Sequence, residues 1–165
     1  MPPTEFVQYW KSVRARTRRV VLLIPDADIE WSYAANRWTF GDIVRHLAGI
    51  ERGMYAETAR GRPSAYPGHD RALAEGHAAV LRYLDESHAS SVAILDAMTP
   101  EQWTGKCTTP AGTPITTWKW LRAMVEHEAH HRGQLYMMLG MRGVKTPPIY
   151  GLTEEEVLER SRTVG

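Results

Sequence analysis

The most regular helical pattern in the chain is residues 116–140, TTWKWLRAMVEHEAHHRGQLYMMLG. One set of its side chains recurs every three or four residues and therefore shares a helix face: Trp120, Met124, His127, His131, Leu135 and Met138. His127 and His131 lie one turn apart on this otherwise apolar face, whereas His130 is rotated about 100° away from it. We therefore expect the pair to face the interior of a helical fold and His130 to face a flank or solvent.

Three further segments have helical periodicity, namely residues of about 4–24, 39–60 and 70–98. Thr39 is a candidate N-cap for the second of them. No segment alternates strongly enough to predict a central sheet. Four long helices predict an all-α four-helix bundle, a fold that builds ligand and metal sites from side chains facing its interior. The connection after the second helix has about a dozen residues and can extend roughly 40 Å, so crossover connections are allowed as well as a simple up-and-down order.

Shorter elements are expected between and after these helices. Thr99-Pro100-Glu101 is typical of the start of a short extra turn, and residues 105–114 predict a small hairpin or an ordered loop. The fourth helix should begin at Thr116 or Thr117 and end before Gly140 or Gly143. A capping-box pattern at residues 153–156, TEEE, predicts a last short helix at the C-terminal end.

Composition limits the classes of protein that this chain can represent. Its 165 residues predict one domain, residues 1–165, and its net charge of +1 argues against binding nucleic acid through phosphate contacts. Its basic run, residues 14–19, spreads over several sides of a helix and predicts a solvated surface. The single cysteine, Cys107, excludes an internal disulfide and a thiolate zinc cluster. No apolar stretch reaches membrane-spanning length and residues 1–5, MPPTE, lack a signal-peptide pattern, so we expect a cytoplasmic protein with no membrane partner.

His46 joins the fourth-helix pair as a third histidine on an apolar stripe, because it lies between Ile43 and Ile50 in the second helix. A buried imidazole costs free energy unless its nitrogens have partners. One divalent metal ion bound by His46, His127 and His131 would satisfy all three and leave open coordination positions, as catalytic sites require. The alternative is that each histidine is an ordinary hydrogen-bonded core residue.

Two histidines of the third helical segment, His77 and His88, are rival ligand candidates because either could face inward.

Three stretches carry a resemblance that covers nearly the whole chain. They are residues 38–48, WTFGDIVRHLA, residues 127–134, HEAHHRGQ, and residues 147–153, PPIYGLT. In this order they resemble the DinB-like family of metalloenzymes. The resemblance implies a four-helix bundle with crossover connections that is often dimeric. It also implies a divalent metal ion, zinc or nickel with iron or manganese as alternatives, on His46, His127 and His131.

Members of that family include thiol transferases that use low-molecular-weight thiols and a thiol-dependent isomerase. The resemblance therefore implies a metal-dependent enzyme, a transferase or hydrolase that activates water or a low-molecular-weight thiol to act on a small molecule. Two alternatives remain open: a non-catalytic metal-binding or stress-related interaction protein, and an interaction module that binds no metal.

Residues next to the histidines each allow two interpretations. Asp42 is one turn before His46 and either accepts its second N–H or stabilises the helix N-terminus by charge. Glu128 is a candidate general base or a solvated side chain, and Arg132 either binds an anionic substrate or pairs with a carboxylate. The last two positions of the motif, Gly133 and Gln134, are expected to allow close helix packing and to orient a neighbouring backbone group.

A second apolar side of the fourth helix predicts an association surface. It consists of Trp118, Leu121, Val125 and Leu139. If these side chains were exposed together, a two-fold contact would be the simplest way to cover them, so we expect a homodimer. The tail after Pro148 is a competing cover for the same residues.

Overall fold

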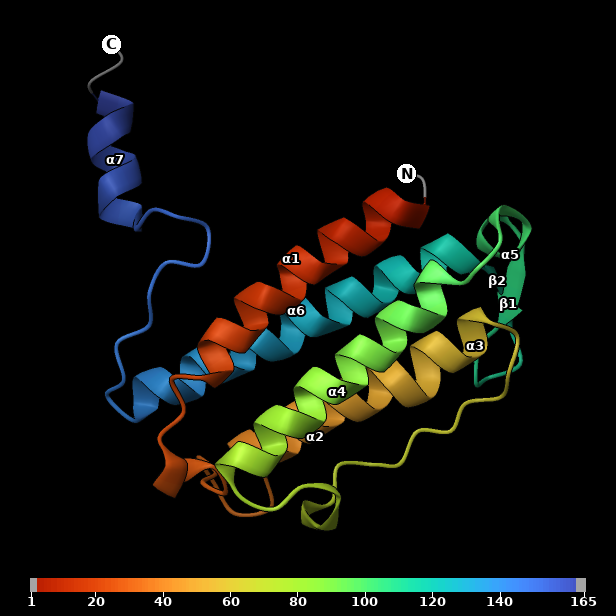
Figure 1. Cartoon of the computed structure of the whole chain (residues 1–165). Coiled ribbons are helices and arrows are strands. Elements are labelled where there is room, and N and C mark those ends of the chain that lie inside the picture. The colour runs from red at the N-terminus through yellow and green to blue at the C-terminus, as the bar shows by residue number, and fades with distance from the viewer. Residues whose placement is uncertain (1–2, 163–165) are drawn as a thin grey trace.

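The computed structural model describes residues 3–162, which form a bundle of four long helical segments (Figure 1). These are α1 (Pro3–Val21), α2 (Phe40–Ile50), α4 (His77–Asp96) and α6 (Thr117–Met141). The predicted all-α four-helix bundle is therefore confirmed. The expected domain of residues 1–165 also includes positions 1–2 and 163–165, which lie outside the described residues.

The second helical segment changes its hydrogen-bonding pattern along its length. After α2 the chain continues through the π-helix η2 (Glu51–Ala56) into the short α3 (Glu57–Ala59), so the segment spans the predicted length. Its start is as expected, because the Thr39 hydroxyl accepts from the Asp42 amide at 3.0 Å and the Asp42 carboxylate accepts from the Thr39 amide at 2.9 Å. Asp42 therefore stabilises the helix N-terminus, the second of the two interpretations.

The long connection between α3 and α4 returns along the bundle. In Figure 1 the segment from residue 60 to residue 76 runs back past α2, so that α2 and α4 point the same way and lie side by side. Helix α1 packs against α4 and α6, and the α2 segment packs against the same two helices. The predicted crossover connection is therefore present, and it has room because an extended chain of this length spans the bundle.

The third helix is shorter than the sequence pattern predicts. It begins at His77 rather than near residue 70, because Gly76 has φ +78, in the left-handed region, and separates it from the 3-10 turn η3 (Arg71–Leu73). The first helix likewise ends at Val21, a few residues before the predicted end, and the short 3-10 turn η1 (Asp26–Asp28) follows.

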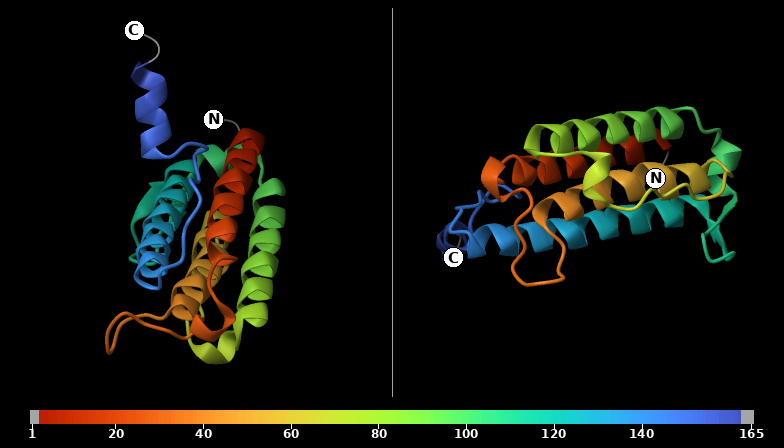
Figure 2. Two further views of the ribbon diagram at one scale, coloured as in Figure 1. Left: turned by 90° about the vertical axis from the view of Figure 1, so that its left-hand side faces the viewer. Right: turned by 90° about the horizontal axis from the view of Figure 1, so that it is seen from below.

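The short elements outside the four long helical segments agree with the sequence. The expected extra turn is α5 (Pro100–Thr104), and the hairpin alternative is correct: β1 (Lys106–Thr108) pairs antiparallel with β2 (Pro114–Thr116). The last helix, α7 (Glu154–Arg162), begins with the predicted capping box and projects away from the bundle (Figure 2).

The expected association surface on α6 is wrong. Leu121 and Leu139 are fully buried and Val125 is nearly so, and all three pack in the bundle core, which leaves only Trp118 of the four exposed. The prediction failed because the buried side of α6 is wide enough to include both these residues and most of the histidine stripe, of which Met124, His131, Leu135 and Met138 are also buried. Because these side chains are covered within one chain, they give no reason to expect a homodimer. Helix α7 has no buried residue and does not act as their cover.

Within residues 3–162, no helix combines the length and hydrophobicity that crossing a bilayer requires.

Candidate metal centre

The three histidines that the sequence selects converge on one point between α2 and α6. The Nε2 atom of His127 lies 3.1 Å from Nε2 of His46 and 3.1 Å from Nε2 of His131. One ring nitrogen from each residue lies within 4.8 Å of the others, the one such group of histidine, cysteine or carboxylate donors among the described residues. We refer to these three residues as the histidine cluster.

Hydrogen bonds on the outer nitrogens orient two of the rings. The Nδ1 atom of His131 lies 2.7 Å from Oε1 of Gln134, and Nδ1 of His46 lies 2.6 Å from the Tyr66 hydroxyl. An amide oxygen only accepts, so His131 donates from Nδ1 and presents the Nε2 lone pair to the cluster. Gln134 therefore orients a histidine ring and not, as expected, a backbone group. This arrangement is typical of metal-binding histidines.

Burial keeps the histidine cluster uncharged. Mainly through burial, and secondarily through the neighbouring imidazoles, the pKa of His46 falls to about 3 and that of His127 to about 4. Burial also lowers the pKa of His131. Neutral imidazole is the form that binds a metal ion, so the rings are in the required protonation state at neutral pH.

The spacing of the nitrogens fits a divalent ion. Two metal–nitrogen bonds of about 2.1 Å at a tetrahedral angle place the two nitrogens roughly 3.4 Å apart, close to the 3.1 Å found here. Lone pairs at this separation repel each other unless a cation or a proton lies between them. Imidazole ligands suit zinc, nickel, iron and copper.

The crossover segment supplies residues that the sequence analysis missed. Tyr66 and His69 lie in it. The His69 ring packs at a tilt against Trp38, with 4.4 Å between ring centroids, and the Trp38 ring is 4.8 Å from that of His46. In the sequence, Trp38 stands out only as the first residue of the motif at residues 38–48. A loop has no periodicity, so no sequence signal could have placed Tyr66 or His69 beside the cluster.

Gly53 lets the crossover segment approach η2. The Ala65 amide donates to the Gly53 carbonyl at 2.7 Å, and a Cβ at Gly53 would lie 2.6 Å from the Ala65 carbonyl oxygen. A larger residue at position 53 would therefore push away the segment that carries Tyr66. Short π-helical segments such as η2 often occur next to functional sites.

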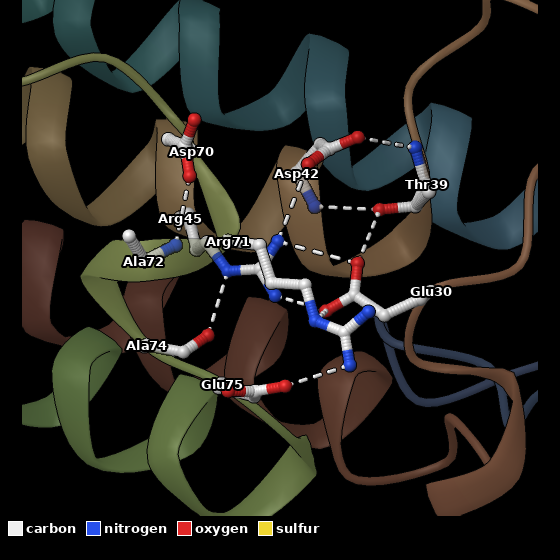
Figure 3. A network of polar contacts seen from close by, with 9 residues as sticks. All are labelled: Glu30, Thr39, Asp42, Arg45, Asp70, Arg71, Ala72, Ala74 and Glu75. Carbon is white, nitrogen blue, oxygen red and sulfur yellow. Dashed lines mark hydrogen bonds and ion pairs between the residues drawn. The ribbon is translucent and has the colours of Figure 1, made fainter.

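A buried arginine, the residue before His46, holds two loops against α2 (Figure 3). Arg45, which is fully buried, donates from Nε to the Ala74 carbonyl at 2.8 Å and from Nη1 to Asp42 at 3.2 Å. Its Nη2 pairs with Glu30. The side chain thus joins the segment before α2 and the end of the crossover segment to the helix that carries His46.

The rival histidines do not reach the cluster. His77 pairs with Asp26 at 3.1 Å, and His88 lies 3.4 Å from Glu51 and packs edge-on against Trp10. His130 is exposed, as its position on the helix predicted.

Neither interpretation of Glu128 is correct. Its side chain is buried on a neighbouring face of α6 and lies 3.4 Å from Arg14, so it is neither solvated nor placed to act as a base at the cluster. One residue turns a helix by about 100°, which is enough to separate Glu128 from its histidine neighbours. Arg14 was expected on a solvated surface and is instead buried beside Glu128 and Glu51.

Two further positions of the motif also differ from expectation. Arg132 is buried and donates to the Thr17 hydroxyl at 3.1 Å and the Tyr150 hydroxyl at 3.2 Å, so it neither faces a substrate nor pairs with a carboxylate. Gly133 is exposed, with no atom within 4 Å of an added Cβ, so it makes no close helix contact.

Comparison with known proteins identifies the family. Residues 9–135 match the sequence profile of the DinB superfamily. The chain belongs to the DinB superfamily. Among curated proteins, this superfamily member is 24% identical to the uncharacterized protein YrdA of Bacillus subtilis (strain 168), over 92% of this chain and 89% of YrdA.

Solved structures show the same fold. A DinB-like protein from Bacillus cereus ATCC 10987 has a TM-score of 0.72 at 18% identity, over 87% of this chain and 94% of that one. YfiT from Bacillus subtilis, described as a probable metal-dependent hydrolase with an unusual four-helix bundle topology, has a TM-score of 0.68 at 21% identity, over 87% and 89%. A mutant of the mycothiol-dependent maleylpyruvate isomerase has a TM-score of 0.67 at 14% identity, over 82% of this chain and 61% of the isomerase.

Proposed function

We propose that this DinB-superfamily protein is a metal-dependent enzyme in which His46, His127 and His131 hold a divalent ion, zinc or nickel in the first instance. The convergence of the three Nε2 atoms carries the proposal. The description of YfiT as a probable metal-dependent hydrolase supports it. Three protein ligands leave coordination positions free, which distinguishes a catalytic site from a closed structural one.

We propose that the nucleophile is water or a low-molecular-weight thiol, in a hydrolase or S-transferase reaction on a small molecule. An ion held by the cluster would act as a Lewis acid and lower the pKa of such a nucleophile towards neutrality. The mycothiol-dependent isomerase among the similar folds supports the thiol alternative. The chain's own residues hold the site: Gln134 and Tyr66 orient the rings, and Trp38 covers the cluster from one side.

Metal analysis of untagged protein tests the proposal. Wild-type protein purified in the presence of zinc or nickel should contain about one ion per chain, and His131→Ala should lose most of it because it removes one of three ligands. His130→Ala is the matched control, since His130 is the exposed neighbour and should leave metal content unchanged. Equal metal loss in both variants, or none in either, would contradict the assignment. Assays with ester substrates and with thiol–electrophile pairs then separate hydrolysis from thiol transfer.

A further inference from the structure

A cavity of about 590 Å³ opens beside the histidine cluster and is lined by His131 and by Gln134, the hydrogen-bond partner of His131. Its walls come from the segment between η1 and α2, which contributes Tyr33 and Trp38, and from the C-terminal half of α6. Small-molecule sites usually enclose roughly 300–1,000 Å³. The cavity is therefore of a size to hold an organic molecule with one end at the cluster.

Large apolar side chains form most of the lining although they are open to solvent. Tyr33, Trp38, Met137 and Met141 are 52%, 36%, 66% and 57% exposed and all line this cavity. A contiguous exposed apolar surface costs free energy in water, so a surface of this kind often marks a site that binds a ligand or a partner. Methionine side chains are flexible and polarizable, so they adapt to aromatic or branched ligands.

Arg37 supplies the single formal charge of the lining. No aspartate or glutamate borders the cavity, and among residues 3–162 no carboxylate pairs with Arg37, whereas Arg45, Arg52 and Arg60 all form ion pairs. Arg37 lies in a turn in which its amide donates to the Ala34 carbonyl at 3.3 Å. An unpaired guanidinium at the mouth of an apolar cavity favours an anion, and its planar fork matches a carboxylate.

The turn that presents Arg37 has an unusual backbone. Asn36, which also lines the cavity, has φ +58, and among residues 3–162 no other non-glycine residue has positive φ. Asparagine tolerates this conformation better than most residues, yet it remains uncommon and often accompanies functional sites. The conformation places Asn36 and Arg37 together at the edge of the cavity.

We propose that this cavity is the substrate pocket of the histidine cluster and takes small organic carboxylates with an aromatic or branched apolar body. Arg37 binds the carboxylate, and the methionines with Trp38 and Tyr33 surround the body. The role of the pocket as the place where a substrate reacts rests on the function proposed above. Its binding preference does not, because recognition by Arg37 and the methionines requires no metal.

Calorimetric titration of the full chain with 2-naphthoate and with the uncharged isostere 2-naphthamide tests the proposal. Wild-type protein should bind naphthoate at least tenfold more tightly than the amide. Arg37→Gln should remove this preference and leave amide binding unchanged. Arg82→Gln, an exposed arginine on α4 away from the cavity, is the matched control and should bind as wild type. Equal affinity for both ligands, or equal effects of the two substitutions, would overturn the proposal.

Methyl NMR of labelled methionines locates the bound ligand. Naphthoate should shift the Met137 and Met141 resonances and leave that of Met98 unchanged, because Met98 is buried in the core with Trp103 and does not line the cavity. Shifts confined to methionines that do not line the cavity would place the ligand elsewhere and overturn the proposal. Metal content of Arg37→Gln should equal that of wild type, so a failed titration with normal metal content refutes the pocket alone. If wild-type protein binds no metal but still prefers naphthoate to naphthamide, only the proposed function is refuted.

Discussion

Two groups of polar side chains lie inside this bundle on different faces of the same helices. The histidine cluster reaches the cavity through His131, whereas Arg14, Glu51 and Glu128, the arginine–glutamate cluster, are buried between α1 and the other helices. Glu128 lies in the sequence between the two α6 histidines, and Glu51 begins η2 shortly after His46. Proximity in sequence therefore says little about which group a residue joins.

The two clusters differ in how their polar atoms are satisfied. In the histidine cluster the outer nitrogens of two rings have partners and the inner nitrogens converge. In the arginine–glutamate cluster, Arg14 bonds to Glu51, but Oε1 of Glu51 and both oxygens of Glu128 have no hydrogen-bond partner among the described residues. Convergent neutral acceptors beside a cavity make a ligand site, whereas buried opposite charges stabilise one packing arrangement and are costly to unbalance.

The largest effect is expected from Arg14→Met. It removes the guanidinium next to two buried carboxylates and should lower the free energy of unfolding by about 3–5 kcal/mol, measured by urea denaturation. Arg18→Met is the control: its pair with Asp85 is on the surface, with side chains 43% and 42% exposed, and should cost about 1 kcal/mol or less. Similar losses in the two variants would mean that the burial of an ion pair does not determine how much its removal costs in free energy of unfolding.

Metal addition should act on the histidine cluster alone. Zinc at a free concentration 100 times its dissociation constant should raise the free energy of unfolding by about 2.7 kcal/mol. Thermal unfolding of wild type and His130→Ala with and without zinc should show this shift, and His131→Ala should not. An undiminished shift in His131→Ala would place the stabilising ion outside the cluster.

Gln134→Leu tests whether the hydrogen bonds around the histidine cluster tune it, because the substitution removes the partner of His131 Nδ1. Because the amide fixes which His131 nitrogen is protonated, metal affinity should fall about 10–100-fold, measured by chelator competition. Gln8→Leu, an exposed substitution on α1, should leave affinity unchanged. If both variants bind metal like the wild type, the Gln134 bond does not tune the site.

The smallest effect concerns Glu57, a carboxylate held by arginines near the surface rather than in the core. Burial raises its pKa, but hydrogen bonds and charges from Arg60 and Arg52 outweigh this, so the pKa lies below its ordinary value of 4.5. A depressed carboxylate pKa stabilises the fold above about pH 4.5, and this contribution is lost as pH falls through the folded-state pKa. The partly exposed arginines limit it to about 1 kcal/mol.

Urea denaturation of wild type and Glu57→Gln between pH 3 and 7 measures this contribution. The difference between the two proteins should shrink towards the acid end of the range. Glu86→Gln, exposed on α4, controls for the general effect of removing a negative charge. A difference between wild type and Glu57→Gln that does not change with pH would argue against a depressed Glu57 pKa.

Periodicity predicted much of the fold and part of the site. The capped helix start at Thr39, the start of α6 after Thr116 and the inward position of His46, His127 and His131 follow from local patterns, which depend on near neighbours in sequence. The same periodicity chose the wrong solvent face for the second apolar side of α6. It fails there because the bundle buries both apolar stripes of α6, and only packing decides how much of a helix surface is covered.

The amino-acid sequence by itself determined the four helices, the histidines that share an apolar stripe and the family resemblance. Those properties are encoded within single helices and single motifs. Only the tertiary structure placed Tyr66 and His69 beside the cluster, buried Arg14 with two glutamates and formed the Arg37 cavity next to His131. Each of these joins residues from different elements, and the crossover segment and the rotation of each helix about its axis, which bring them together, are set by packing rather than by local pattern.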